Sequence, residues 1–542
     1  MKAPSTSPIS RSNSLERRVA CVCPLPGWAN TPTRFLPIWA TVRIRSQRSR
    51  QTKLSGAMKA WKKPRLNGAL KRTNRRISRR VRRKANSCGP PSGTGGKSKS
   101  MSLETQAQEN EPEGGVSGAY ANYVLGVLFV VYVFNFMDRQ VLSIVIEPLK
   151  LELGLSDTQI GLLAGFAFSL MYTFAGIPIA RYADRASRRN VVTVGLLVWT
   201  SFTAMTANVG NFSQLFMTRI GVGIGEAAGS PPSHSMISDY FPPRRRATAL
   251  SVYGMGVYIG IAAAMIFGGY IAQNFGWRSV YLAVGLAGIP LALLVRFTVK
   301  ELPRGYSDRV AGVATSIPEQ PPLGEALKTI LSIRSLMLII AGTAVQSLAG
   351  YGLMVWGAPF MMRIHGMSQT DVGLSLGLIF GIAGCAGVLS GGWLSDTLGQ
   401  RDPKWYMRLP AFQAILGLPF LGGFLLAEDS TTALICFAPF YFIANMYIGP
   451  MFAMTQSLVP PTMRATASAI NLFIVNLIGL GLGPLLMGFL NDALAAQYGA
   501  ESIRYSLLSV GAVGGTAFIF FWLASTSLPR DLAAARAAAT AD

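Results

Sequence analysis

Long apolar stretches recur along the chain from residue 119 onward, separated by short polar breaks. A stretch of about 20 apolar residues is long enough to cross a bilayer as a helix. Half of the 542 residues are hydrophobic and 14% are charged, which is also typical of a membrane protein. We therefore expect an all-α membrane protein with twelve transmembrane helices, near 120–147, 158–180, 190–208, 211–236, 247–273, 279–299, 335–363, 371–394, 407–427, 432–457, 465–490 and 504–525.

Two motifs occur twice, once in each half of the predicted set of spans. PPRRRATA at 242–249 returns as PPTMRATA at 460–467, and ARYADRASRR at 180–189 corresponds to GWLSDTLGQR at 392–401. Parallel repeats of six spans are the architecture of carriers that rock one half against the other. The predicted organisation is two pseudo-symmetric six-helix halves, 119–299 and 335–526, with a cytoplasmic linker, 300–334, and a cytoplasmic tail, 527–542.

The net charge of +25 comes almost entirely from the N-terminal segment. Residues 1–100 contain 25 Lys and Arg and one acid, Glu16, whereas 25 basic and 24 acidic residues follow from Met101 onward. Segment 1–118 is expected to be a basic, disordered leader. Three interpretations of residues 1–100 stay open: a tail for nucleic acid or anionic lipid, a targeting peptide, or translated upstream sequence outside the mature protein. We expect no nucleic-acid partner.

The loops predict the orientation of the chain. With a cytoplasmic N-terminus, the cytoplasmic loops hold sixteen Lys and Arg, and the opposite loops hold four, namely Lys150, Arg278, Arg363 and Arg504. Because basic residues gather in cytoplasmic loops, both termini are predicted to be cytoplasmic.

Four charged residues lie inside predicted spans. The segment FNFMDRQ at 134–140 places Asp138 and Arg139 in the first span, and the fourth span carries Arg219 and Glu226 seven residues apart, on one helical face. Counted from the external ends, Asp138 and Arg219 are equally deep, so they can face each other. A charge in the membrane is costly unless it is paired or faces water. We predict a charge-balanced cluster beside a water-accessible cavity.

The residue types suggest roles within this cluster. A carboxylate that loses its arginine partner in a dry cavity takes up a proton, so Asp138 and Glu226 are assigned to proton coupling. Guanidinium groups bind carboxylate or phosphate with fixed donors, so Arg139 and Arg219 are assigned to an anionic substrate. The alternative is a structural ion-pair network that only holds two spans together. Spans of the second half contain no interior acid or base, and Tyr351 and Trp356 are expected to form walls of the substrate pocket.

The repeated Asp-Arg loop signatures resemble the loop between the second and third spans of the major facilitator superfamily. Within that superfamily, NFMDR, RIGVGIGEAA and SDYFPPRRRATALS resemble the spinster-like group. The resemblance implies that the cluster of four charges lines the transport cavity and takes part in proton coupling. It also implies a cytoplasmic latch at the loop signatures, and we assign the following residues to this cytoplasmic gate: Asp184, Arg185, Arg188, Arg189, Asp239, Asp396 and Arg401.

Enzyme classes find little support, because the chain lacks a Ser-His-Asp set, metal-ligand spacing and a phosphate loop after a strand. No cofactor or metal is expected. The predicted function is a proton-coupled secondary transporter of an amphipathic or organic, lysolipid-like anion, working as a monomer in a bacterial inner membrane. One alternative is a proton symporter for sugar acids or other carboxylates. The other is a membrane-anchored binding protein that acts through its basic tail.

Overall fold

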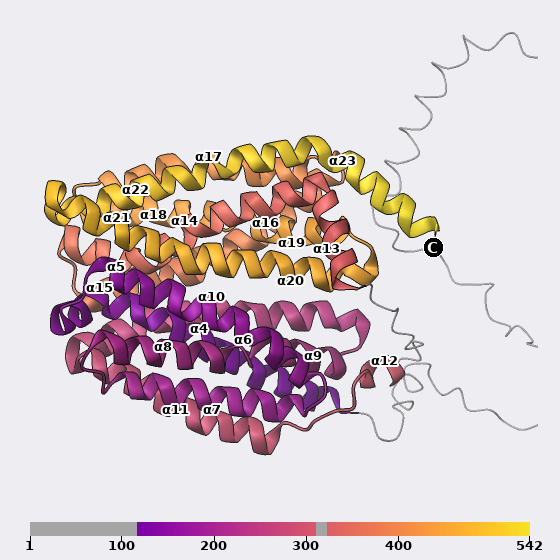
Figure 1. Cartoon of the computed structure of the whole chain (residues 1–542), viewed down its shortest axis with the longest axis horizontal. Helices are drawn as coiled ribbons and strands as arrows, with labels where there is room; N and C mark the ends of the chain where they lie inside the picture. The colour runs from indigo at the N-terminus through magenta and orange to yellow at the C-terminus, as the bar shows by residue number, and fades with distance from the viewer. Residues whose placement is uncertain (1–115, 311–321, 542) are drawn as a thin grey trace, which may run out of the picture. The chain divides into compact units, whose positions relative to one another are not determined.

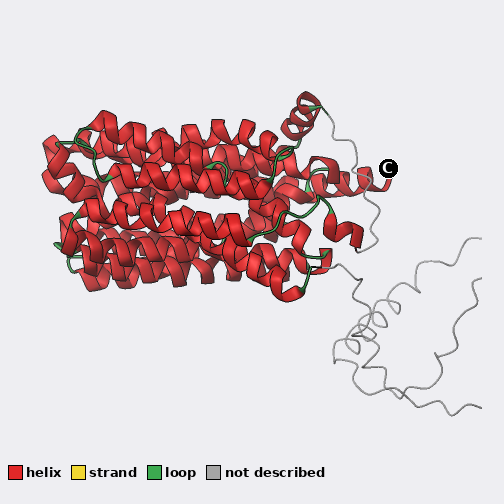
Figure 2. Ribbon diagram, turned by 90° about the horizontal axis from the view of Figure 1, so that it is seen from below, coloured by secondary structure: helices red, strands yellow, loops and turns green. Residues whose placement is uncertain are grey.

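The computed structural model describes residues 116–310 and 322–541, which all belong to one unit, Gln108–Asp542. Most of the predicted leader and part of the predicted linker lie outside these described residues. Within them the chain is helical and has no strand, as Figure 2 shows. The prediction of an all-α membrane protein is confirmed.

The helices follow one another with short connections. In the first half they are α4 (Gly118–Leu153), α5 (Asp157–Gly161), the π-helical η1 (Leu162–Ala167), α6 (Phe168–Ala183), α7 (Arg188–Thr206), α8 (Phe212–Glu226), α9 (Ser230–Tyr240), α10 (Pro243–Phe275) and α11 (Trp277–Thr298). Between the halves lie α12 (Tyr306–Val310) and α13 (Leu323–Ser332).

The second half repeats this order. It contains α14 (Arg334–His365), α15 (Gln369–Leu378), the π-helical η2 (Ile379–Ala383), α16 (Gly384–Gly399), α17 (Trp405–Leu426), α18 (Ser430–Ala444), α19 (Ile448–Ser457), the 3₁₀ turn η3 (Pro461–Met463), α20 (Arg464–Ile474), the π-helical η4 (Val475–Leu482), α21 (Gly483–Tyr498), the 3₁₀ turn η5 (Gly499–Glu501), α22 (Ser502–Gly515) and α23 (Ala517–Ala541).

Local sequence explains where the helices begin and end. Ser156 caps α5 through a capping box with Gln159, which satisfies two free N–H groups at the helix start. Gly154 and Gly366 end α4 and α14 with φ of 64° and 62°, a left-handed conformation that favours glycine. The repeated Pro-Pro motifs stand at the start of α10 and of the 3₁₀ turn η3 that leads into α20, so the same sequence signal starts corresponding helical segments in the two halves.

Each predicted span coincides with one helix or with a run of consecutive helices. Among the described residues, nine helical stretches are long and apolar enough to cross a membrane. The third and fourth predicted spans are not among them, and the eleventh and twelfth fall within one stretch, Arg464–Ala537. The predicted tail continues α23 as far as Ala541. The count of twelve transmembrane helices and the orientation of the termini stay predictions.

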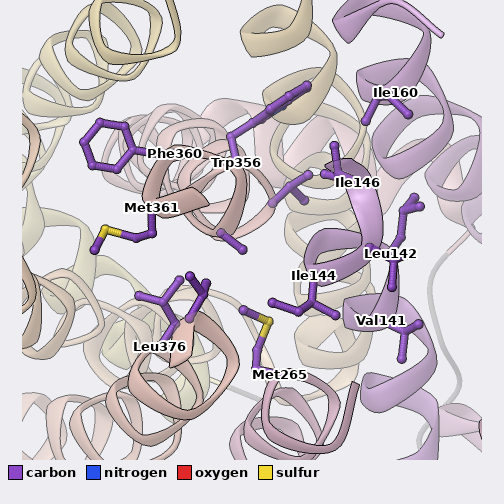
Figure 3. Close-up of a cluster of buried hydrophobic side chains, with 14 of the residues drawn as sticks. Val141, Leu142, Ile144, Ile146, Ile160, Met265, Trp356, Phe360, Met361 and Leu376 are labelled. Carbon is purple, nitrogen blue, oxygen red and sulfur yellow. The ribbon is translucent and has the colours of Figure 1, made fainter. Parts of the chain in front are cut away.

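The two halves lie side by side, the first in indigo to magenta and the second in orange to yellow (Figure 1). We call the end that carries α12 and α13 the linker end and the opposite end, with α5 and α15, the closed end. A large cluster of buried apolar side chains joins the halves toward the closed end: Ile144 and Met265 of the first half pack with Trp356, Phe360 and Leu376 of the second (Figure 3).

Glycines allow the backbones of the two halves to touch at the closed end. A Cβ atom on Gly488 of α21 would lie 2.1 Å from the backbone oxygen of Asp157 at the start of α5. One on Gly373 of α15 would lie 2.2 Å from the backbone oxygen of Met265 in α10. Only a residue without a side chain permits such close helix approach, so these glycines let the two halves pack directly against each other at the closed end.

Candidate functional site

The charged residues of α4 and α8 meet in the interior of the first half. Arg139 Nε lies 2.5 Å from Glu226 Oε2, and the Glu226 side chain is fully buried. The Arg139 guanidinium also lies over three aromatic rings, those of Phe136, Phe168 and Tyr172, at 4.9, 4.9 and 4.5 Å from the ring centroids. A cation between aromatic faces is attracted by their quadrupoles. Arg139 is therefore held by one ion pair and by an aromatic cage.

Asp138 and Arg219 face each other, as their equal depth predicts. Asp138 Oδ1 lies 3.8 Å from Arg219 Nη2, and both side chains are almost completely buried. Asp138 Oδ2 accepts a hydrogen bond from the hydroxyl of Thr203 on α7. Arg219 lies 5.8 Å from the ring centroid of Tyr281 on α11. The structure thus brings all four predicted charges together and adds Thr203, which the sequence did not single out.

A small cavity of about 20 Å³, enough for a water molecule, lies beside this cluster. Arg139, Gln140 and Arg219 line it from the first half, and Tyr351 and Met354 line it from the second. Gln140 Nε2 also donates to the Met354 backbone oxygen across the two halves at 3.0 Å. Both arginines border the cavity, while the two carboxylates are not among its lining residues.

Trp356 lies away from this cavity, in contrast to its expected place in the pocket wall. Its side chain is fully buried, and Nε1 donates to the Pro484 backbone oxygen at 3.0 Å. Its ring faces the guanidinium of Arg363 at 5.6 Å. These contacts make Trp356 part of the packing toward the closed end. A contact between Trp356 and the substrate remains untested, and the position of Trp356 in this structure gives it no support.

Part of the predicted cytoplasmic gate forms a buried network at the linker end. Arg188 pairs with Asp239, and its Nε lies 2.8 Å from Glu301 Oε1. The backbone N–H of Arg189 also donates to Glu301 at 2.8 Å, and that of Gly305 to Asp239 at 2.8 Å. Burial acts to raise the pKa of Glu301, but the hydrogen bonds from Arg189 and Arg188 outweigh it and leave that pKa below its usual range.

The remaining predicted gate residues are exposed and do not join this network. Asp184, Arg185, Asp396 and Arg401 form no ion pair among the described residues. Asp396 accepts one hydrogen bond, from the Tyr406 hydroxyl at 3.2 Å. The Asp-Arg loops of the two halves are therefore not tied to each other in this structure.

The closed end carries an ion-pair cluster that sequence reasoning missed. Arg363 of α14 contacts Asp157 of α5 at 2.5 Å and Glu147 of α4 at 2.7 Å. Lys150 also pairs with Asp157 at 2.5 Å. Asp492 of α21 accepts hydrogen bonds from the Asp157 and Thr158 N–H groups at 3.1 and 2.8 Å.

Of the ion pairs within residues 116–310 and 322–541, the two made by Arg363 are the ones that link the halves. We call Arg363, Asp157 and Glu147 the closed-end clamp. The sequence had counted Arg363 only as a loop charge, because nothing local relates it to carboxylates about 200 residues away. Among all described residues, 116–310 and 322–541, no three His, Cys, Asp or Glu side chains are placed to hold a metal ion.

Known proteins resemble this chain over most of its length. A family model described as Major Facilitator Superfamily matches residues 128–484. An MFS-type efflux pump of Mycolicibacterium smegmatis is 36% identical over 413 residues, which is 75% of this chain and 93% of the relative. A probable L-galactonate transporter of Escherichia coli is 26% identical over 408 residues, 73% of this chain and 87% of the relative. A solved bacterial homolog to the human lysosomal transporter Spinster, inward-facing and unoccupied, matches with a TM-score of 0.69 at 30% identity over 77% of this chain and 99% of that chain.

Proposed function

The chain belongs to the Major Facilitator Superfamily as a spinster-like transporter, and we propose that it moves an amphipathic or organic anion by alternating access, coupled to protons. We infer that it works as a monomer in the inner membrane of a bacterium. In this proposal Asp138 and Glu226 carry the proton, and Arg139 and Arg219 bind the anionic group, with Tyr351 as part of the wall of the site.

The double role of Arg139 carries the proposal. Arg139 borders the cavity, and its guanidinium is at the same time the ion-pair partner of the buried Glu226, at 2.5 Å. When this site is wider than in the present structure, an anionic substrate that reaches Arg139 competes with Glu226 for this guanidinium. A carboxylate buried without its counter-ion favours the neutral form, so substrate binding and proton uptake become linked.

The two ends of the bundle support alternating access. The closed-end clamp and the glycine contacts join the halves at one end, whereas the Asp-Arg loops at the other end are exposed and unpaired within the described residues. With the predicted orientation, this arrangement corresponds to an inward-facing state. In the opposite state the clamp opens, and we infer that the loop residues Asp184, Arg185, Asp396 and Arg401 then close the linker end.

A second candidate substrate class is a sugar acid. The relative from E. coli is named a probable L-galactonate transporter, and a sugar carboxylate would use the same two arginines. The polar side chain of Gln140 also borders the cavity, and it could meet a hydroxyl group of such a substrate.

The test is proton uptake by liposomes that contain the full chain, or the chain from Met101, with a panel of lysolipids, fatty acids and sugar acids. We expect one class to drive proton movement, and we expect Glu226→Gln and Asp138→Asn each to abolish it. Glu152→Gln is the matched control, because this carboxylate pairs with Arg278 at the surface of the closed end. If both variants move protons like the wild type, the proton-coupling role is wrong, and the four charges form a structural ion-pair network that holds α4 and α8 together. Loss of activity on removing residues 1–100 would favour the binding-protein alternative.

A further inference from the structure

The hydroxyl of Thr203 has one proton and two oxygen atoms to which it can donate. Thr203 Oγ1 lies 2.9 Å from the backbone oxygen of Trp199, one turn earlier in α7, and it also contacts Asp138 Oδ2 on α4. Thr203 and Asp138 are both fully buried. Since a hydroxyl donates one hydrogen and accepts through its lone pairs, it can serve only one of these acceptors at a time.

We propose that Thr203 is a positioning residue for the proton on Asp138, and that its hydroxyl reverses direction when this carboxyl is protonated. While Asp138 is ionised, Thr203 donates to Oδ2. When a proton arrives on Oδ2, the new carboxyl O–H donates to Thr203 Oγ1, and the Thr203 proton turns to the backbone oxygen of Trp199. One proton is added to Oδ2, no covalent bond breaks, and Oδ2 keeps a hydrogen-bond partner in both states. The inference rests on the proposed function, because it gives the coupled proton a binding partner.

Close helix packing fixes the position of the Thr203 hydroxyl. A Cβ atom on Gly285 of α11 would lie 2.5 Å from the Ala204 backbone nitrogen, and one on Gly225 of α8 would lie 2.6 Å from the Trp199 backbone nitrogen. The backbone of α7 is therefore held on two sides around Thr203. A donor held in this way is not free to follow Asp138 if the carboxyl moves, so the hydroxyl responds by rotating about its own C–O bond.

Thr203 is the one described residue whose side chain forms a hydrogen bond with the Asp138 carboxylate. Arg219 of α8 lies 3.8 Å away, too far for a hydrogen bond, and Asp138 Oδ1 has no hydrogen-bond partner among the described residues. Arg139 of α4 is paired with Glu226 of α8. Among the other helices packed against α4 and α7, α11 brings Tyr281, which lies beside Arg219. These helices also carry charged or histidine side chains, none of which forms a hydrogen bond or ion pair with Asp138: Asp157 of α5, His234 and Asp239 of α9, Arg244, Arg245 and Arg246 of α10, Arg278 and Arg296 of α11, Arg334, Arg363 and His365 of α14, and Asp371 of α15.

Infrared difference spectroscopy of the full chain in liposomes, recorded as a function of pH, tests this role without a substrate. The protonated Asp138 carboxyl gives a C=O stretching band that Asp138→Asn removes. In Thr203→Val, which loses the hydroxyl but keeps the shape of the side chain, we expect the band to appear at a pH about one unit higher. The reason is that the ionised form loses a charge-assisted hydrogen bond, and the neutral form loses a weaker one.

Three companion variants make the result decisive. Thr203→Ser keeps the hydroxyl and should titrate like the wild type. Thr203→Ala serves as a second variant without a hydroxyl in case the valine side chain disturbs folding. Thr206→Val is the matched control, since the Thr206 hydroxyl donates to the Phe202 backbone oxygen of its own helix.

An unchanged titration in Thr203→Val and Thr203→Ala would overturn the proposal. So would the absence of an Asp138 band in the wild type at any pH, which would also remove Asp138 from the coupling mechanism. A band that shifts as expected, in a protein whose liposomes move no protons with any substrate of the panel, would support the role of Thr203 and reject the proposed function alone.

Discussion

Replacing Arg363 by glutamine should open the closed end of the transporter. Arg363 is the residue of α14 whose ion pairs join the two halves, with Asp157 at 2.5 Å and with Glu147 at 2.7 Å. The Arg363 side chain is 15% exposed and that of Asp157 is 3% exposed, so the contact is largely shielded from water. The variant leaves Asp157 with Lys150 and leaves Glu147 without an ion pair at the closed end.

The size of the effect follows from the burial of the clamp. Removing one partner from a buried ion pair costs about 3–5 kcal/mol, and the partial exposure of Glu147 places this case near the lower limit. The cost falls only on the state in which the clamp is formed. A difference of about 3 kcal/mol shifts a two-state equilibrium by about a hundredfold, which turns a rare open state into a substantially populated one.

Distances between spin labels across the closed end measure this shift. Leu151 at the end of α4 and Gln497 at the end of α21 are both exposed, so each accepts a label after replacement by cysteine. The labels require a background in which the five natural cysteines are replaced. We expect a population with longer distances in Arg363→Gln and a smaller one in Arg363→Lys, which keeps the charge but not the planar donor geometry.

Arg278→Gln is the matched control, because Arg278 pairs with Glu152 at the same end but within the first half. Its distance distribution should equal that of the wild type. If Arg363→Gln also gives the wild-type distribution, the apolar core and the glycine contacts hold the closed end without the clamp, and the energetic reasoning given above is wrong.

Two further predictions concern the closed end and the linker end. Gly488→Val should favour the open state in the same distance measurement, since a Cβ atom there would lie 2.1 Å from the backbone oxygen of Asp157. An unchanged distance distribution would mean that the contact between α5 and α21 accommodates the valine without opening the closed end, and would contradict this prediction. Glu301→Gln should lower the stability of the protein in detergent at neutral pH by about 1 kcal/mol, a value reduced for the partial exposure of this carboxylate. Because the pKa of Glu301 in the folded protein lies below its ordinary value of 4.5, its stabilisation is present above that pH and is lost as the pH falls through the lowered pKa. Thermal melting should therefore separate the two proteins at pH 7 and bring them together under acidic conditions, and a constant difference at all pH values would contradict this.

Much of the architecture could be predicted because it depends on short-range sequence signals. Hydropathy is a property of consecutive residues, and each predicted span falls on a helix or a run of helices. The depth of Asp138 and Arg219 could be counted from the span ends, and the structure places them 3.8 Å apart. The spacing of Arg219 and Glu226 likewise placed both on one face of α8.

The sequence by itself determined the helical membrane architecture, the internal repeat and the four intramembrane charges, because helix length, periodicity and the cost of a charge in lipid act on each segment separately. Only the tertiary structure decided which further groups these charges meet. In the folded chain Thr203 contacts Asp138, Trp356 lies outside the lining of the cavity, and Arg363 pairs with Asp157. Such contacts join residues that are far apart along the chain, and they depend on the rotation and approach of packed helices, which no local pattern encodes.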